Sequence, residues 1–411
     1  MFSRRRIALA LFVVVLVVPQ VLSIRLIKST VLDDSIPRKV TAGFLTAGKV
    51  YLATQGGKTD HAYALQVPIP SMSVVTKWDT SALSIYPNLI PSAVLVPDSQ
   101  MAFFSMSTPF AFYTFRATLN NPTFALQADK FLSSESTPQY EDVGTTTMTD
   151  YAGTRIYVTS GMALLQLSAS SLVVQATIDN LQFVATVAVL SFKGDFIIYG
   201  GTVPSDPSVG TITRIFIRDK SNNPTVPVGP VLPVTRKEFG GLSSINVMDG
   251  NVFAVALVNP NDVYGVPTLL KYFLDNTTIV NSLSLYDLSG GAVAMAGPNN
   301  IDLYVAGSPG TIVHVDMKRW VVMDTKHVLE QSPFSFAVLD PSNYTNPVGY
   351  FASEADPDNN TPCTLVQMDL FTPDWITPSA TPTARSGAFT NSVHFGVLLS
   401  MACMLILLGV L

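Results

Sequence analysis

The sequence predicts an all-β protein, a seven-bladed β-propeller of four-stranded antiparallel blades that is closed by an N-terminal strand. Three observations predict this fold. A strand–turn–strand pattern recurs seven times, further short apolar runs follow the copies, and no long helical periodicity appears after residue 23. Repeats of about 40–50 residues that each form one small sheet are typical of propellers.

The recurring unit is an apolar run, a tight turn, and a second apolar run that is centred on a large residue and ends in small ones. Its copies lie at 40–57, 92–107, 145–161, 185–201, 243–257, 291–308 and 336–353. The aligned central residues are Tyr51, Phe103, Tyr157, Ile197, Phe253, Tyr304 and Tyr350, with spacings of 52, 54, 40, 56, 51 and 46 residues. The mean spacing of about 50 fits a four-stranded blade.

Further runs supply the outer strands of each blade. Third strands are expected at 62–68, 111–116, 162–168, 213–218, 269–274, 311–317 and 364–370, and fourth strands at 73–78, 172–178, 278–285 and 320–328. Glycine occupies the first turn of four copies, at Gly48, Gly153, Gly194 and Gly250. Glycine supplies the positive φ that tight hairpins need.

The seventh copy lacks a fourth strand, because the sequence after 370 is rich in Pro, Thr and Ser. That composition predicts an extended stalk at 372–386. The spare run at 23–31 is expected to complete the last blade and close the ring, which protects the sheet edges. The propeller is therefore expected to span 24–371.

Both ends of the chain predict secretion and attachment to a membrane. Residues 1–23 combine three arginines, an apolar run and a small residue at Ser23, as in a signal peptide. Small residues from Ser386, a short spacer and the apolar run 395–411 resemble a GPI-attachment signal, with Ser386 as the lipidated residue and 387–411 as the propeptide. A C-terminal transmembrane helix is the alternative. Either arrangement predicts the extracellular face of the plasma membrane as the location.

Composition restricts the partners. The net charge is −5 and only 13% of the residues are charged, so no basic field indicates nucleic acid. The chain has two cysteines, Cys363 and Cys403, and the second lies in the tail. Three N-x-S/T sequons, at Asn276, Asn343 and Asn359, predict N-glycosylation of a secreted glycoprotein.

Blades three and six resemble the YVTN-type β-propeller repeat of surface-layer and other extracellular proteins. The residues that carry the resemblance are IYVTSGMALLQLSASSLVVQATI (156–178) and LYVAGSPGTIVHVDMKRWVVMDT (303–325). The run at 336–353 with TLVQMDLF is similar to a related repeat of microbial and protist surface proteins. The resemblance implies a propeller on a cell surface, and the family has no shared catalytic residues to transfer.

The search for chemistry yields no catalytic residue and no cofactor motif. His61, His314 and His327 show no metal-ligand spacing and are expected to be structural. Glu354, Asp356 and Asp358, beside Asn359, are the candidate Ca²⁺ ligands. The glycine and the distal glutamate of an EF-hand loop are missing, so a solvated loop is the favoured interpretation.

The order of strands in a propeller sorts the loops onto two faces. Loops between second and third strands share a face with the connectors between blades, and 201–211, 257–267 and 353–363 are expected to be long insertions there. The opposite face is expected to have short turns and to hold Asn276 and Asn343. Because binding usually resides in long loops on a rigid scaffold, the long-loop face is the predicted ligand-binding face.

Three functions fit these features. The first is a binding or adhesion module for a protein or glycan. The second is an extracellular enzyme, such as a glycan hydrolase, lyase or lactonase, with its site at the channel mouth. The third is a structural coat protein. No acid–base pair or metal set is visible in the sequence, which favours the binding module over the enzyme.

Overall fold

The computed structural model confirms the all-β, seven-bladed propeller. It describes residues 24–370 except 33–36, 57–62, 75, 80–91, 97–100, 108–110, 120–124, 134–144, 151, 161, 179–180, 192, 219–233, 237–238, 249–250, 258–264, 274–277, 300, 331, 341, 343–346 and 357–360. The chain divides into two compact units, Met1–Thr372 and Pro373–Leu411. All described residues belong to the first unit.

In the described part of the chain, strands form seven four-stranded antiparallel sheets. Blade 1 contains β2 (Pro37–Thr46), β3 (Lys49–Gly56), β4 (Tyr63–Pro68) and β5 (Thr76–Asp79). Blade 2 contains β6 (Ser92–Leu95), β7 (Met101–Ser107), β8 (Ala111–Thr118) and β9 (Ala125–Ser133). Blade 3 contains β10 (Thr145–Thr149), β11 (Arg155–Ser160), β12 (Ala163–Ser168) and β13 (Val174–Ile178).

The second half of the ring follows the same order. Blade 4 contains β14 (Val184–Leu190), β15 (Phe196–Val203), β16 (Asp206–Phe216) and β17 (Val234–Arg236). Blade 5 contains β18 (Leu242–Met248), β19 (Asn251–Leu257), β20 (Pro267–Phe273) and β21 (Ile279–Ser284). Blade 6 contains β22 (Ser289–Ala296), β23 (Asp302–Ser308), β24 (Thr311–Asp316) and β25 (Val321–His327). Blade 7 contains β26 (Phe334–Leu339), β27 (Val348–Ser353), β28 (Thr364–Asp369) and β1 (Arg25–Val31).

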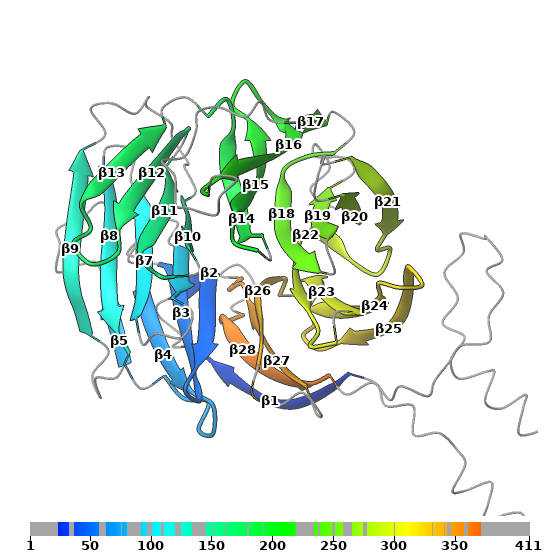
Figure 1. The fold of residues 1–411 in the computed structure, drawn as a ribbon. Coiled ribbons are helices and arrows are strands. Elements are labelled where there is room, and N and C mark those ends of the chain that lie inside the picture. The colour runs from blue at the N-terminus through cyan, green and yellow to red at the C-terminus, as the bar shows by residue number, and fades with distance from the viewer. Residues whose placement is uncertain are drawn as a thin grey trace, which may run out of the picture. The chain divides into compact units, whose positions relative to one another are not determined.

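The first strands of the blades form a closed inner ring. Each touches the first strand of the next blade, from β2 through β6, β10, β14, β18 and β22 to β26, and β26 touches β2 again. Figure 1 shows the seven sheets around this common centre. A closed ring leaves no sheet face of the first or last blade uncovered.

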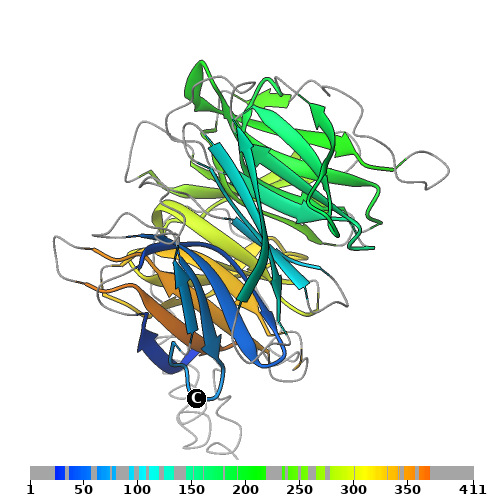
Figure 2. The same ribbon diagram turned by 90° about the vertical axis from the view of Figure 1, so that its left-hand side faces the viewer.

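The N-terminal strand completes blade 7, as the sequence predicts. β1 pairs antiparallel with β28, from Arg25 opposite Asp369 to Val31 opposite Thr364. Both ribbon views show the dark-blue β1 beside the orange strands of blade 7 (Figure 1 and Figure 2). The ring thus closes where the first strand of the described chain, β1, pairs with the last, β28.

Burial explains why the second strands are the clearest in the sequence. They lie in the middle of each blade and are covered by the neighbouring blades on both faces, so β15 reads FIIYGGTV and is buried over six consecutive residues. Outer strands face solvent, and the first five residues of β1 are all exposed. Continuous apolar runs therefore mark the blade centres, whereas the outer strands carry little pattern.

One position repeats in all seven blades, two residues after the turn that joins the first and second strands. It holds Tyr51, Phe103, Tyr157, Ile198, Phe253, Tyr304 and Tyr350, and each is buried against the next blade. The cross-strand partner on the third strand is always a long polar residue. These partners are Gln66, Arg116, Gln166, Arg214, Lys271, His314 and Gln367.

In blades 5, 6 and 7 the polar partner lies against the large side chain. The His314 ring stacks on Tyr304 with centroids 4.9 Å apart, and the Lys271 ammonium lies 5.8 Å from the Phe253 ring centroid. The Gln367 amide donates to the Tyr350 hydroxyl at 3.1 Å. Such cross-strand pairs stabilise a sheet by up to about 1 kcal/mol each, so the repeat has a structural role.

Two sequence predictions in blade 4 are wrong. The repeat position is Ile198 and not Ile197. In blade 3 the hydrogen bond from Asp150 N to Arg155 O closes the turn two residues before Tyr157. In blade 4 the corresponding bond runs from Ser191 N to Phe196 O, two residues before Ile198. Residues 201–211 are no loop insertion either. β15 and β16 continue as a hairpin with only 204–205 between them, because the β-branched residues after Pro207 extend the third strand.

Turn chemistry follows expectation where it is described. Gly48, Gly153 and Gly194 have φ of 72°, 63° and 68°. The Asp150 carboxylate also accepts hydrogen bonds from Thr154 N at 2.8 Å and Arg155 N at 3.2 Å. Gly250 lies outside the described residues.

Candidate binding face

The strand order defines two faces of the ring. We call the face that carries the turns between first and second strands the exit face; it includes the turn at Ala47 and Gly48. We call the opposite one, with the hairpin turn at Pro204 and Ser205, the far face. The far face is the one that the sequence predicts to bind ligand.

Both ends of the described chain lie at the exit face. β28 ends there, since Leu370 N donates to the carbonyl of Pro347 in a turn of that face at 2.8 Å. Ile24 directly precedes Arg25, the partner of Asp369. The described chain therefore begins and ends at the same face of the ring.

The two faces differ less in loop length than the sequence predicts. The far face has long connections at 80–91, 134–144, 258–266 and 354–363, most of whose residues lie outside the described part. The exit face has one of comparable length, 217–233, between β16 and β17. The expectation that the exit face has only short turns is therefore wrong, and loop length alone does not identify a binding face.

The described far-face connections have a distinct surface chemistry. Tyr286, between β21 and β22, is 73% exposed, more than any other large hydrophobic side chain described. The acidic residues of these connections are Asp287, Glu330, Glu354 and Asp356, and the described connections contain no Lys or Arg. The exposed Tyr286 lies beside Asp287 in the sequence of this connection.

The structure describes two of the three candidate Ca²⁺ ligands, Glu354 and Asp356. Glu354 forms an ion pair with Lys39, with Nζ and Oε1 2.6 Å apart. The backbone of Asp356 pairs with Thr361, and Asp358 lies outside the described residues. Within the described ranges, no group of three potential ligands is close enough to hold a metal ion.

The channel wall is formed by the first strands and is uncharged where it is described. After Lys39, the sequences of β2, β6, β10, β14, β18, β22 and β26 contain no Asp, Glu, His, Lys or Arg. Hydroxyl groups instead join adjacent blades. Thr186 donates to Leu242 O at 2.9 Å, and Ser243 donates to Ala292 O at 2.6 Å. These side chains hold the ring together and offer no acid–base pair.

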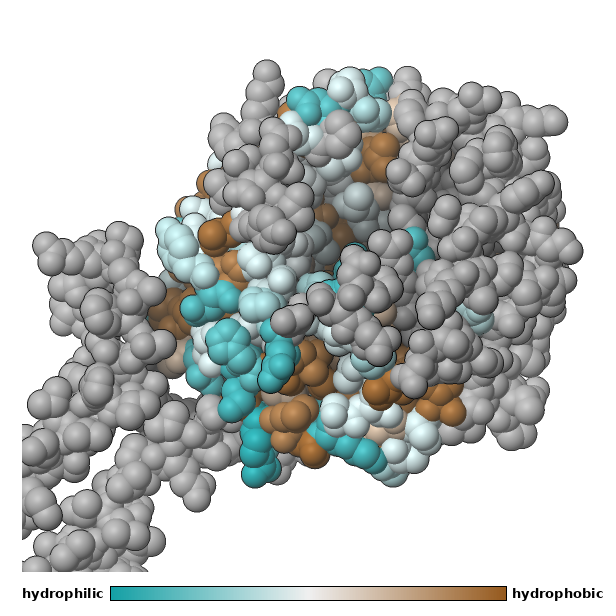
Figure 3. Space-filling view, turned by 180° about the vertical axis from the view of Figure 1, so that it is seen from behind, coloured by the Kyte–Doolittle hydropathy of each residue, from teal (hydrophilic) through white to brown (hydrophobic). Residues whose placement is uncertain are grey.

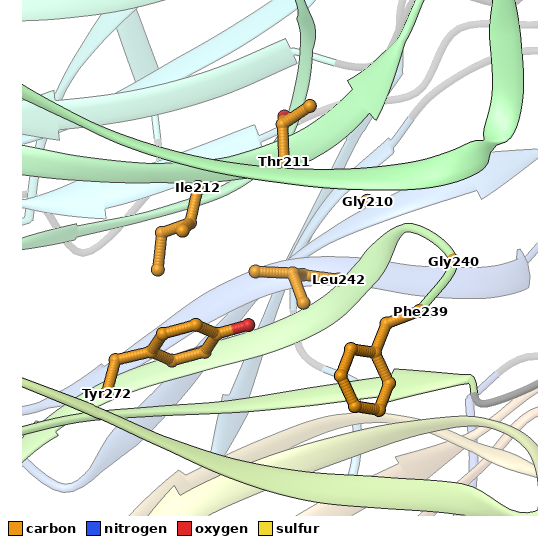
Figure 4. A pocket seen from close by; sticks show the side chains of 7 residues that line it. All are labelled: Gly210, Thr211, Ile212, Phe239, Gly240, Leu242 and Tyr272. Carbon is orange, nitrogen blue, oxygen red and sulfur yellow. The ribbon is translucent and has the colours of Figure 1, made fainter. Parts of the chain in front are cut away.

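A small crevice separates blades 4 and 5. It leaves essentially no room for a water molecule and is lined by Gly210, Thr211, Ile212, Phe239, Gly240, Leu242 and Tyr272. Ile212, Leu242 and the Tyr272 ring point toward one another, whereas Thr211 points to the other side of its strand (Figure 4). Small-molecule sites usually enclose about 300–1,000 Å³, so this crevice is a packing gap.

The described histidines have structural partners. His314 is buried, and its Nε2 lies 2.7 Å from Asp302 Oδ1. His327 Nδ1 lies 2.7 Å from Thr311 Oγ1. His61 lies outside the described residues. The His314 imidazole is closed off from solvent, whereas His327 is exposed at the end of β25.

Cys363 is buried and unavailable for pairing with another chain. Its thiol donates to Ser353 O at 2.8 Å. Burial, and to a smaller degree the Glu354 carboxylate, raises the thiol pKa to about 12. The thiolate that disulfide exchange needs is therefore scarce at neutral pH.

The remaining site residues lie outside the described part of the chain. They are the sequon residues Asn276, Asn343 and Asn359, the lipidation candidate Ser386, the signal peptide 1–23, the stalk 372–386 and the tail 387–411. Within the described ranges, no helix has both the length and the apolar character needed to cross a membrane. These features stay predictions from the sequence.

Comparison with known proteins gives no family for this chain. No protein-family model matches it, and no curated protein matches it. The resemblance of blades three and six to the YVTN-type repeat therefore stays a prediction, while the seven-bladed propeller itself is established by the sheet topology.

Proposed function

We propose that this protein is a binding module on the extracellular face of the plasma membrane, and that its far face contacts a protein or glycan ligand. One observation carries the proposal: Ile24 and Leu370 lie together at the exit face. A tether that follows Leu370, by a lipid at Ser386 or by a C-terminal helix, starts at the exit face. It leaves the far face unobstructed.

The chemistry of the far face suggests the kind of ligand. Its exposed Tyr286 offers a large amphipathic contact, and tyrosine is enriched among residues that dominate binding energy. The carboxylates of Asp287, Glu330 and Asp356 repel anionic groups. We therefore expect a neutral or cationic protein surface or an uncharged glycan, and weaker binding to sulfated or sialylated glycans.

Blocking each face in turn tests the proposal. Full-length protein on cells carries single cysteines at Ser205→Cys or Glu330→Cys on the far face, or at Lys193→Cys on the exit face. Each is coupled to a polyethylene glycol maleimide, and Cys363 does not compete because its thiol is buried. We expect binding to cells or matrix to fall for the far-face sites alone.

A single side chain provides a finer test. We expect Tyr286→Ala to weaken binding about tenfold or more, the effect typical of a central aromatic contact. Val173→Ala, at an exit-face residue that is 53% exposed, is the matched control and should bind as the parent does. Equal losses from both faces, or losses from the exit face alone, would reject the assignment. Phosphatidylinositol-specific phospholipase C should release the protein from cells if the anchor is a lipid.

A further inference from the structure

Near the exit face, the exposed large hydrophobic side chains include Val173, Phe216 and Phe273 on blades 3, 4 and 5, and a group of six aliphatic ones on the outer side of blades 5, 6 and 7. We call this group the apolar rim. It consists of Leu26 and Ile27 at the start of β1, Val280 at the start of β21, Val321 and Val322 at the start of β25, and Ile301 in the exit-face turn of blade 6. Each is between 38% and 47% exposed.

Hydrogen bonds hold the outer strands of these three blades together. Ile24 N donates to Asp324 Oδ2 at 3.2 Å and joins blade 7 to blade 6. The Trp320 indole donates to Ser282 O at 3.0 Å and joins blade 6 to blade 5. The view from behind shows hydrophobic surface interrupted by hydrophilic surface over the described residues (Figure 3). The two bonds place the outer strands that carry the apolar rim side by side.

Cationic side chains flank the apolar rim. Arg25 is paired with Asp369 at 3.2 Å, and its side chain is 75% exposed. Arg319 is 3.7 Å from Asp316 and 40% exposed. Aliphatic groups bordered by paired, exposed guanidinium groups match the boundary between lipid headgroups and acyl chains.

The chain that follows Leu370 brings a lipid surface within reach. Sixteen residues, 371–386, separate Leu370 from a lipid at Ser386, and 24 residues, 371–394, separate it from the apolar segment 395–411. A coil of 16–24 residues spans about 20–30 Å, whereas an extended stalk reaches about 50–75 Å. Because a short tether raises the effective concentration of the membrane at the exit face, weak apolar contacts suffice to hold the ring there.

We propose that the apolar rim rests on the lipid surface, so that the ring leans on blades 5, 6 and 7 while the far face points outward. This inference rests on the proposed tethering. The rim is then a second, reversible contact with the membrane. This contact determines which blades hold their far-face loops farthest from the membrane. A second copy of the chain is the competing occupant of the same surface.

Lipid-borne quenching tests the proposal. The protein, purified with its anchor and carrying Cys403→Ser, is reconstituted in phosphatidylcholine vesicles that contain acyl-chain nitroxide lipid. An environment-sensitive NBD fluorophore is attached at Ile27→Cys or Val322→Cys. The matched controls are Val173→Cys, also exposed and on the exit face but in blade 3, and Ser205→Cys on the far face.

We expect several-fold stronger quenching at positions 27 and 322 than at 173 and 205. Protein that floats with the vesicles but shows equal quenching at all four positions overturns the rim contact alone. Fluorescence that shifts to the blue at position 27 without lipid quenching, in a protein that sediments as a dimer, assigns the rim to a second copy and also overturns it. Protein that does not associate with vesicles refutes the tethering on which both proposals rest.

Discussion

Ring closure depends on the buried N-terminal residue that precedes β1. Ile24 is 1% exposed and packs in one cluster with Met295 and Tyr304 of blade 6 and with Phe351 and Val366 of blade 7. It therefore fastens the last two blades to each other as well as the first strand to the last. Ile24→Ala removes most of this buried side chain and leaves a cavity that the two sheets cannot fill.

We expect Ile24→Ala to lower the free energy of unfolding by about 2–5 kcal/mol, the cost typical of truncating a buried isoleucine to alanine. Ile27→Ala is the matched control, because Ile27 is 47% exposed and should change stability by no more than about 0.5 kcal/mol. Denaturant titration of both purified variants measures the difference. Equal and small effects would show that the N-terminal strand does not fasten the ring, and the closure argument would fail.

Three further predictions follow from buried groups. Tyr304→Phe should lower the free energy of unfolding by about 0.5–1.5 kcal/mol, because the Tyr304 hydroxyl donates to Leu370 O at 2.9 Å. Tyr199→Phe should be neutral or stabilising, because its buried hydroxyl has no partner among the described residues. Thermal melts of both variants test this, and a larger loss for Tyr199→Phe would contradict the assigned hydrogen bonds. Gly201→Ala should destabilise by about 1–3 kcal/mol, since the new Cβ would lie 1.9 Å from Val184 O, while Gly291→Ala, with no atom within 4 Å, should melt like the parent. Cys363, with its pKa raised to about 12 by burial, should resist maleimide at pH 8 and react after unfolding in guanidinium; labelling of the folded protein would show that the blade 7 core opens.

The sequence is sufficient to predict the blades where packing imposes a pattern. Second strands are covered on both faces, so their apolar runs stand out, and the spare run at 24–31 is recognisable because the seventh copy lacks a fourth strand. β9 and β17 escape prediction because outer strands face solvent and need no continuous apolar run. Ile197 and Ile198 are equally apolar, and only strand register tells which of them faces the next blade.

The candidate site is less predictable than the fold, because connections carry no periodicity. Pro204, Ser205 and Pro207 suggest a loop, yet the β-branched residues that follow pair with β15 and reduce the loop to a turn. The repeated polar partner on the third strands is present in the sequence, for example as Gln66 and His314. It becomes recognisable when the third strands are aligned by their register with the second strands.

The orientation of the two faces relative to the membrane is the most direct test of the functional account. Lys193 and Ser205 are exposed and lie at opposite ends of β15, an eight-residue strand that spans about 26 Å. Fluorophores at Lys193→Cys and Ser205→Cys on cell-tethered protein can transfer energy to an acceptor lipid in the outer leaflet. The account predicts clearly stronger transfer from position 193, on the exit face. Equal transfer, or stronger transfer from position 205, would contradict it.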